Sequence, residues 1–255
     1  MMQPVLLLIL AVALAAPALG QNALNDSGLD TCYDYSSATG GTEPASYPRQ
    51  DCRFGRDAAN AVAALVKTGA GTKGFDFTKI GNNGATLLAN TPLGTSPASW
   101  ACTFDNTTGL MWEVKTAGAT DLRNMNSTYS WYSTDTLSNG GYAGTPKNGV
   151  CQGGIDCDTM SYVKAVNTAV LCGHADWRLP TVEELLSLAD FSQPHGSATA
   201  IDTVYFPNMV DDVYWTGTNC AANNGSAAYV VFRGAYTVYN SKSMDFRALL
   251  VRSGQ

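Results

Sequence analysis

The longest apolar run of the chain lies close to its first residue. Residues 5–16 read VLLLILAVALAA, and no Asp, Glu, Lys or Arg precedes Asp26. A helix that crosses a bilayer needs about 20 apolar residues, so this run is too short to span one but has the length of the apolar part of a secretory signal. Ala18 and Gly20 supply the small side chains of a cleavage point before Gln21. We therefore expect residues 1–20 to be a signal peptide, the alternative being an uncleaved N-terminal anchor.

Helical periodicity first appears at residues 57–68. Apolar side chains recur there on one face, Asp57 precedes them as a potential N-cap, and Gly69 follows as a terminator. The residues before it, 21–56, are rich in Gly, Ser, Tyr and Pro and predict irregular structure. Residues 69–99 return to Gly, Asn and Thr, which also predicts loops.

Two further helices are expected in the second half of the chain. One begins after Asp158 and ends at Gly173, with valines recurring on one face. The other begins at Thr181, which has the capping-box spacing to Glu184 and is followed by an apolar stripe.

Alternating patterns predict strands around these helices. The segments are 108–114, 213–217, 228–232, 236–240 and 247–252, with turn signals at Asn223–Gly225 and Arg233–Gly234. A long polar insertion separates the first strand from the helices, over residues 116–157. Helices followed by a terminal run of strands indicate an α+β domain.

The low content of charged residues and the negative net charge limit the classes of partner that the chain can bind. Charged residues make up 14% of the chain against a usual ~25%, and the formal net charge is −6. A nucleic-acid partner needs a basic face, so this composition excludes that class. No later segment is long and apolar enough to span a membrane.

Seven cysteines fit disulfides in an oxidising compartment, with one thiol left over. A metal site is the alternative, but no CxxC motif occurs and the two histidines have no ligand-like spacing. We therefore expect no metal and no cofactor. The disulfide candidates are Cys32, Cys52, Cys102, Cys151, Cys157, Cys172 and Cys220.

The sequence carries no motif for catalysis. No Ser or Cys near His174 suggests a nucleophile–base pair, and Glu183–Glu184 fit a helix start better than an acid–base pair. We expect no catalytic residues and no enzyme. The alternatives are an exported hydrolase or thiol oxidase, and a structural module of the envelope.

Several segments occur in an order that resembles a known family. They are DNTTGLMWE (105–113), DWRLPTVEELLSL (176–188), AID (200–202), YFP (205–207), YWTGT (214–218) and LLVR (249–252). Together they are similar to the domain at the C-terminus of the Lcl collagen-like adhesin, found in many exported bacterial proteins. The earlier DTCYD (30–34), GRDAA (55–59) and GFDFTKI (74–80) resemble the N-terminal portion of one subtype of that family.

This resemblance implies a C-type-lectin-like fold related to formylglycine-generating enzymes, with two or three helices flanking a small twisted, mostly antiparallel sheet. It divides the mature chain into a loop-rich N-terminal elaboration packed on the main domain (21–99) and the Lcl C-terminal-like domain (100–255). Many relatives end in RCVR where this chain has LLVR, so Cys220 must pair elsewhere or stay free. The fold relative with oxidase activity depends on two cysteines near its C-terminus, whereas this chain has only Cys220 there, so we expect that activity to be absent. The collagen-like adhesin's domain is credited with binding sulfated polysaccharides, and the acidic charge of this chain argues against that class of ligand.

The signature residues are better explained by folding than by chemistry. Arg178 has a fork of donors that suits a carboxylate such as Glu184 or Asp176, the alternative being an anion clamp. Trp112 and Trp215 are expected in the core, the alternative being sugar stacking. The structural set is Trp112, Trp177, Arg178, Pro180, Glu184, Trp215 and Arg252.

The C-terminal strands hold the candidate binding surface. Tyr, Asn and Ser give contact area and adaptable hydrogen bonds, as in antibody paratopes, although the same residues also occur as ordinary polar positions of a hairpin. The candidates are Asn219, Asn223, Asn224, Arg233, Tyr236, Tyr239, Asn240 and Ser243. We expect a secreted, periplasmic or surface protein that binds a glycan or a surface protein through them.

Overall fold

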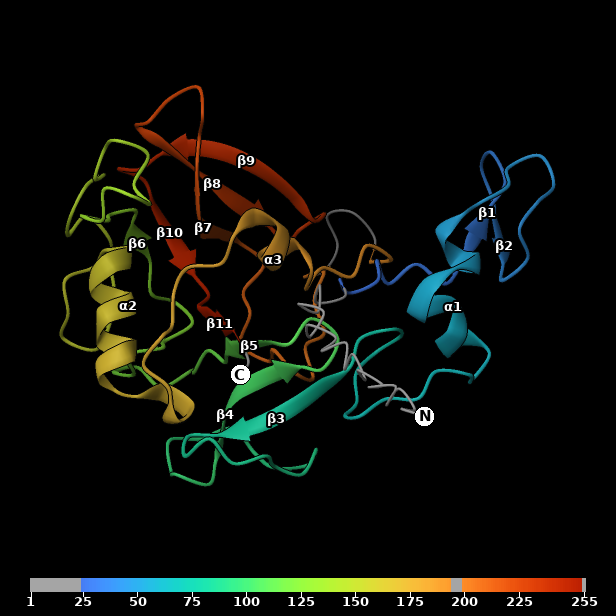
Figure 1. Ribbon diagram of the computed structural model, residues 1–255, viewed down its shortest axis with the longest axis horizontal. Helices are drawn as coiled ribbons and strands as arrows, with labels where there is room; N and C mark the ends of the chain where they lie inside the picture. Colours follow the sequence, from blue (N-terminus) through green and yellow to red (C-terminus); the bar gives the residue numbers. More distant parts are fainter. Residues whose placement is uncertain (1–23, 194–198, 254–255) are drawn as a thin grey trace, which may run out of the picture.

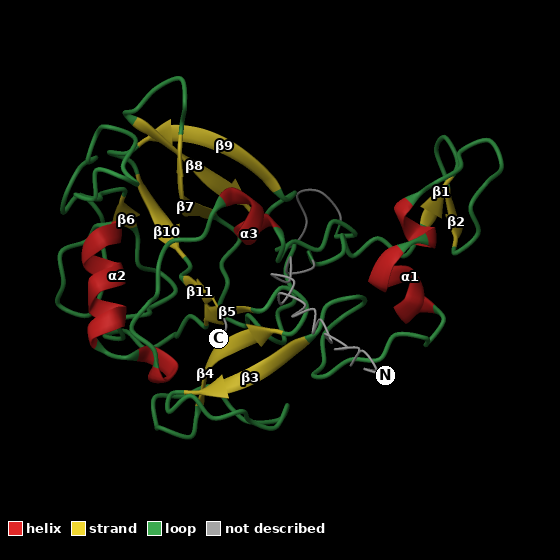
Figure 2. Cartoon of the chain, in the orientation of Figure 1, coloured by secondary structure: helices red, strands yellow, loops and turns green. Residues whose placement is uncertain are grey.

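The computed structural model describes residues 24–193 and 199–253 as two main sheets, of five and four strands, and a separate two-stranded sheet near the N-terminus (Figures 1 and 2). The predicted signal peptide and its cleavage point lie outside the described residues. The α+β prediction is confirmed, and most strand pairs are antiparallel. Within the described residues, no helix has the length and apolar character needed to cross a membrane. The C-type-lectin-like fold itself stays a prediction.

The larger sheet has five strands in the order β6-β10-β7-β8-β9. Four of these strands come from the last quarter of the described chain, and their bounds are Val213–Asn219 (β7), Ser226–Val231 (β8), Tyr236–Ser241 (β9) and Asp245–Ala248 (β10). β6 (Tyr129–Ser130) joins from the long polar insertion. β10 runs parallel to β7, so the predicted terminal strands do not form a simple meander.

The smaller sheet has the order β11-β5-β4-β3. Its strands are Phe77–Gly81 (β3), Trp100–Asp105 (β4), Leu110–Glu113 (β5) and Val251–Ser253 (β11). The prediction of one strand over 247–252 is wrong, because β10 ends at Ala248 in one sheet and β11 begins at Val251 in the other. The chain crosses between the sheets at Leu249 and Leu250, which are fully buried.

The sequence did not predict β3, where we expected loops over 69–99. Only Phe77 and Ile80 are apolar in this five-residue strand, so its pattern is too short to stand out. β3 forms because β4 offers a complete antiparallel partner, from Phe77 opposite Asp105 to Gly81 opposite Trp100. The division of the chain at residue 99 stays a prediction, and β3 pairs across it.

The two later helices begin where the capping residues predict. The Asp158 carboxylate accepts the Ser161 N–H at 2.8 Å at the start of α2 (Thr159–Thr168). Thr181 and Glu184 form a complete capping box at the start of α3 (Val182–Leu186). α2 ends five residues earlier than expected, because Val170, directly after its C-cap Ala169, adopts a left-handed backbone. Cys172 is left-handed as well and is bonded to Cys102.

The first helix differs more from its prediction. α1 covers Gly55–Ala61, so Asp57 lies inside it and is not its cap. The buried Asp57 carboxylate instead accepts the N–H groups of Gly28 and Gly74 at 2.6 and 2.7 Å. Val66, expected on the buried face, is 90% exposed.

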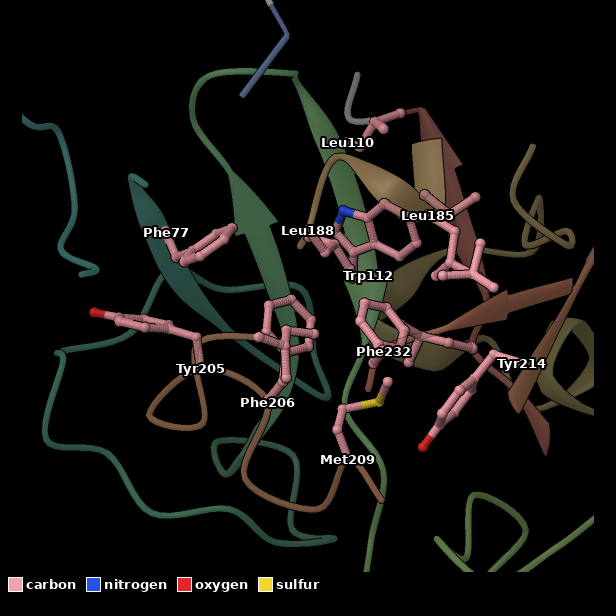
Figure 3. Close-up of a cluster of buried hydrophobic side chains, with 14 of the residues drawn as sticks. Phe77, Leu110, Trp112, Leu185, Leu188, Tyr205, Phe206, Met209, Tyr214 and Phe232 are labelled. Carbon is pink, nitrogen blue, oxygen red and sulfur yellow. The ribbon is translucent and has the colours of Figure 1, made fainter. Parts of the chain in front are cut away.

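The main core lies between the two sheets and under α3. Figure 3 shows the Trp112 indole of β5 among Leu185, Leu188 and Phe232, which come from α3, the segment after it and the end of β8. A second core lies under α2 around Tyr162, Val166 and Trp177. Leu249 belongs to the first core and Leu250 to the second, so the crossing segment contributes to both.

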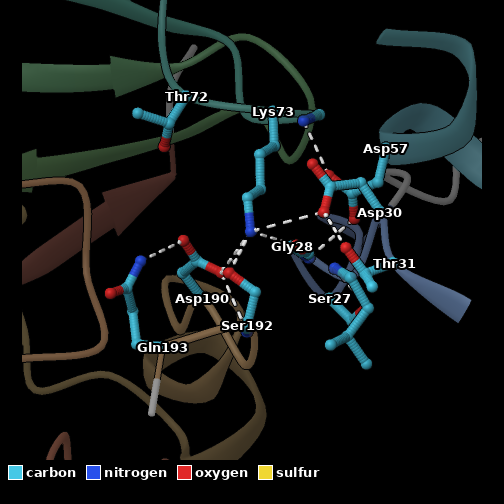
Figure 4. A network of polar contacts seen from close by, with 12 residues as sticks. Ser27, Gly28, Asp30, Thr31, Asp57, Thr72, Lys73, Asp190, Ser192 and Gln193 are labelled. Atoms are coloured by element: carbon cyan, nitrogen blue, oxygen red, sulfur yellow. Dashed lines mark hydrogen bonds and ion pairs between the residues drawn. The ribbon is translucent and has the colours of Figure 1, made fainter. Parts of the chain in front are cut away.

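The N-terminal segment projects from the body as a small unit, which we call the N-terminal knob (residues 30–53). It contains β1 (Cys32–Tyr33), β2 (Ala38–Gly40) and a 3₁₀ turn, η1 (Asp51–Arg53), and lies next to α1 at the far side of Figure 1. Lys73 connects its base to the body: the ammonium donates to the Gly28 carbonyl at 2.6 Å and lies 3.5 Å from Asp190 and 3.9 Å from Asp30 (Figure 4).

Three disulfides confirm the expectation from the cysteine count. They join Cys32 to Cys52, Cys102 to Cys172, and Cys151 to Cys157, which leaves Cys220 as the free thiol of the described residues. The second closes a separation of 70 residues and ties β4 to the segment after α2, whereas the third closes only 6.

We predict that Cys102→Ala with Cys172→Ala destabilises the protein about twice as much as Cys151→Ala with Cys157→Ala. Loop-closure entropy gives about 4 and about 2 kcal/mol respectively, because the longer loop gains more freedom in the unfolded chain. Urea unfolding of the two double variants and the parent measures the difference. Equal losses, or a larger loss from the short loop, would contradict the prediction.

Candidate binding surface

The segment before α3 is held by two arginine–carboxylate pairs. Arg178 donates to both carboxylate oxygens of Glu184 at 2.6 and 2.7 Å, and Arg252 donates to Asp176 at 2.7 and 3.3 Å. The backbone of Arg178 also exchanges two hydrogen bonds of 2.9 Å with Val251 of β11. The guanidinium of Arg178 is therefore paired within the fold while its side chain remains 43% exposed, and its role towards an anion stays a prediction.

The aromatic signature residues are inside the molecule. Trp112, Trp177 and Trp215 are at most 2% exposed. The indole N–H of Trp177 donates to the Leu171 carbonyl at 3.1 Å and that of Trp215 to the Tyr129 carbonyl at 2.8 Å. Pro180 is buried as well, and its carbonyl accepts the Gly217 N–H at 2.7 Å. No face of these three indoles is open for stacking on a sugar.

Both paired carboxylates have shifted titration. Burial raises the pKa of Glu184, but the Arg178 fork and the Thr181 N–H outweigh it, so this pKa lies below its usual value. The hydrogen bond from Arg252 lowers the pKa of Asp176. Both groups therefore stay ionised in the folded protein at mildly acidic pH.

The eight candidate ligand residues lie along the hairpin of β8 and β9 and do not form one pocket. Five of them, Asn219, Asn223, Asn224, Asn240 and Ser243, lie towards the end where β8 begins and β9 ends. Arg233 and Tyr236 lie at the opposite end of the hairpin, where the Arg233 guanidinium pairs with Asp211 at 3.0 Å. Tyr239 lies between these groups.

Several of the candidate asparagines hold the loops themselves. The Asn219 amide donates to the Ser138 carbonyl at 2.6 Å, which ties the end of β7 to the polar insertion. The Asn223 side chain accepts the Gly225 N–H at 3.0 Å and donates to Ser226 at 3.2 Å, which closes the turn before β8. These two side chains shape the surface more than they offer free hydrogen-bonding groups.

β9 is the most accessible part of the candidate surface. It is an edge strand that pairs only with β8 in the described residues, in a regular antiparallel register from Tyr236 opposite Val231 to Ser241 opposite Ser226. Tyr236, Val238 and Tyr239 are 45%, 39% and 49% exposed. Because successive side chains alternate, Tyr236 and Val238 lie on one face of the sheet and Tyr239 on the other.

An aromatic row that sequence reasoning missed leads to this edge. Phe246 of β10 lies 4.5 Å from Trp215 and 4.9 Å from Tyr229 between ring centroids, and Tyr229 of β8 is opposite Val238 of β9. These four side chains share one face of the five-stranded sheet. The row was not visible in the sequence, because β10, which carries Phe246, follows β9 in the chain but lies beside β7 and parallel to it.

A hollow that the sequence also did not reveal lies beside β7. It has a volume of about 490 Å³ and is flanked by Met160 and Val163 of α2, Leu179, and Gly217 and Thr218 of β7. The hydroxyl of Thr218 already accepts the Val182 N–H at 3.2 Å. Trp131 and Pro180 add to its apolar wall, while Arg178 and Asp135 bring charged side chains to it.

Most of the two main sheets and the helices α2 and α3 lie within one recognised family domain. The family model described as the Lcl C-terminal domain matches residues 101–252, which run from β4 to β11. The chain belongs to the Lcl C-terminal domain family. No curated protein and no solved structure matches it.

Membership bears on where the protein acts. The Lcl C-terminal domain and the three disulfides together indicate an extracellular, adhesin-related domain, while the compartment itself stays a prediction. The DWRLPT and terminal VR segments, which carried the resemblance, meet in the structure through Arg178, Val251, Asp176 and Arg252. These contacts join β11 to the segment before α3.

We predict that Glu184→Gln destabilises the domain by about 1 kcal/mol at pH 7. This loss is smaller than the one expected for a fully buried ion pair, because Arg178 is partly exposed and solvent screens its charge. The folded pKa of Glu184 is lowered, so its contribution is present above the unfolded pKa of about 4.3 and is lost as the pH falls through the folded value. The difference between variant and parent should therefore vanish on acidification.

Thermal unfolding followed between neutral and strongly acidic pH measures this effect. Glu183→Gln is the matched control, since Glu183 is exposed in the same helical turn and is not paired with Arg178. A Glu184→Gln deficit that persists in acid would rule out the ion pair as its cause.

Proposed function

We propose that this member of the Lcl C-terminal domain family is a non-enzymatic, exported binding protein that takes up an extended segment of a surface protein along β9. The observation that carries the proposal is the open, uncharged edge of the five-stranded sheet. An edge strand presents a row of unpaired backbone N–H and C=O groups, which is the template for strand addition.

The usual protections of an edge strand are missing from β9. Natural edges carry Lys, Pro, inward charges or bulges that prevent pairing with another chain. β9 reads YTVYNS, without a charge or a proline, and its register with β8 has no bulge. An edge strand of six residues without these protections is therefore more consistent with a surface that binds another chain than with one that only avoids aggregation.

The placement of the tyrosines favours a polypeptide over a glycan. A sugar ring stacks on one aromatic platform, whereas Tyr236 and Tyr239 project from opposite faces of β9. An added strand sends its side chains alternately to both faces, so it contacts both tyrosines. On the face of Tyr236 it also meets Val238, which continues the row of Phe246, Trp215 and Tyr229.

The absence of enzymatic activity belongs to the same proposal. Glu113, Lys115 and Tyr162 form a connected group of titratable side chains, and they are at most 4% exposed. A substrate does not reach such a group without unfolding the core. An exported hydrolase or thiol oxidase, and a structural module of the envelope, remain the alternatives.

The test is a binding screen of the mature protein on arrays of glycans and of envelope and host-surface proteins. Val238→Lys should weaken binding of protein hits about tenfold, because it places a charge beside the incoming strand. Tyr236→Ala with Tyr239→Ala should weaken the same hits. Amide hydrogen exchange of β9 should slow in the complex, since strand addition protects its outward N–H groups.

Val204→Lys is the matched control, because Val204 is exposed and lies away from β9. Unchanged hits in the Val238→Lys and tyrosine variants would refute β9 as the site. If only glycans bound, and hydrogen exchange of the β9 amides did not slow, the protein would bind sugars and the strand-addition proposal would be wrong.

A further inference from the structure

The N-terminal knob displays aromatic side chains to solvent. Tyr35 is 89% exposed and Tyr33 is 51% exposed, and Tyr47 and Phe54 are also exposed. Residues 30–53 lie outside the part of the chain that the Lcl C-terminal domain accounts for. Figure 1 shows the knob projecting away from both sheets, so no part of the main core explains these side chains.

The loops that carry the tyrosines are fixed in one conformation. The Gln50 amide accepts the Tyr33 N–H at 2.7 Å and donates to the carbonyls of Tyr33 and Tyr47 at 2.6 and 2.9 Å, which ties the backbones of the two segments together. The Cys32–Cys52 disulfide closes the same unit. The Thr39 hydroxyl lies 2.7 Å from the Thr42 carbonyl and 3.0 Å from that of Cys32, and its single hydrogen is donated to one of them.

Such fixation matters for recognition. A loop that is already ordered loses little entropy when it binds, and Tyr gives large contact area with few rotatable bonds. The serines, glycines and tyrosines of residues 33–47 therefore have the composition and the rigidity of a matured paratope. A loop that served only to connect elements would not need this many internal hydrogen bonds.

The charge around the tyrosines is negative. The knob carries the carboxylates Asp30, Asp34, Glu43 and Asp51 against the guanidinium groups Arg49 and Arg53. At its base, Asp51 also lies with Asp26 and Asp57, with carboxylate oxygens within 4.8 Å of one another. In the described residues no basic side chain lies within 4 Å of these three carboxylates, of which Asp51 is the exposed one, whereas Asp30 lies 3.9 Å from the Lys73 ammonium.

We propose that the N-terminal knob is a second binding surface, which holds a lysine- and arginine-bearing polypeptide segment of a partner. Cationic side chains lie over exposed tyrosine rings, and the surrounding carboxylates pair with the same charges. Neutral and acidic partners can contact the tyrosine rings but cannot pair with the carboxylates, so these two contributions favour basic partners. This surface is separate from β9 and does not depend on strand addition.

The test uses the mature protein and a fluorescent twelve-residue peptide of alternating Lys, Arg and Gly, with a Glu-for-basic counterpart. The basic peptide should bind and the acidic one should not. Tyr33→Ser with Tyr35→Ser should weaken binding on the order of tenfold, the loss expected from two exposed cation–π contacts. Both side chains are exposed, and the Gln50 bonds to the Tyr33 backbone remain.

A second variant tests the charge without disturbing the loops. Asp34 accepts the N–H groups of Ser36 and Ser37, and Glu43 accepts that of Gln50, so Asp34→Asn with Glu43→Gln keeps acceptors in both places. This variant should weaken binding severalfold and reduce its salt dependence. Leu88→Ser with Val204→Ser is the control, because both side chains are exposed and belong neither to the knob nor to β9, and this variant should bind the basic peptide as the parent does.

Two outcomes would overturn the proposal. The first is no binding of the basic peptide by the parent, or equal binding of the acidic one. The second is binding that the Tyr33 and Tyr35 substitutions leave unchanged, which would reduce the effect to the general acidity of the chain.

Discussion

The buried carboxylate of Glu113 holds the two sheets together where the chain crosses between them. Glu113 lies at the end of β5 and is fully buried, and its oxygens accept the Leu250 N–H at 2.8 Å and the Lys115 ammonium at 2.9 Å. The Tyr162 hydroxyl of α2 donates to the same carboxylate at 2.5 Å and accepts from Lys115 at 2.8 Å. One charged group thus joins β5, α2 and the segment between β10 and β11.

Breaking the hydrogen bonds and the ion pair of Glu113 destabilises the fold, and their geometry fixes the course of the backbone at Leu250. Burial lowers the pKa of Lys115, and the neighbouring Glu113 carboxylate opposes that shift. Burial raises the pKa of Tyr162, and the same carboxylate raises it further, so Tyr162 stays a neutral hydrogen-bond donor. Removing one partner of a buried ion pair costs about 3–5 kcal/mol, because the other charge is left without a counter-ion. The carboxylate therefore fixes the position of Leu250, and through it the end of β10 and the start of β11. With β10 fixed beside β7, the order of the larger sheet leaves β9 at its edge.

The sequence predicts those elements whose signals are local. The Asp158 cap and the Thr181–Glu184 capping box involve residues three apart, and both helices begin where expected. Asp57 has the same side chain, but its partners are Gly28 and Gly74, which lie 29 and 17 residues away, so its role is set by tertiary contacts. β3 depends on β4 in the same way. The break of the predicted 247–252 strand at Leu249 depends on Glu113, which precedes Leu250 by 137 residues.

The same distinction applies to the candidate surface. Composition identified the stretch that contains β9, because Tyr, Asn and Ser are visible residue by residue. It did not separate Asn219 and Asn223, whose amides close loops, from the tyrosines that face solvent. The aromatic row was hidden for a topological reason: Phe246 reaches Trp215 only because β10 lies parallel to β7 and is not paired with β9, its neighbour in sequence.

The two exposed surfaces differ in the physical basis of their selectivity. β9 carries no charge, so recognition there depends on backbone hydrogen bonds and apolar contact, which salt affects little. The N-terminal knob is acidic, and charges exposed on a surface are screened beyond about 8–10 Å at physiological ionic strength. Figure 1 places β9 and the knob on different sides of α3, so one partner segment does not need to satisfy both. Because Lys73 and Asp57 tie the base of the knob to the body, a ligand bound there stays in a fixed position relative to β9.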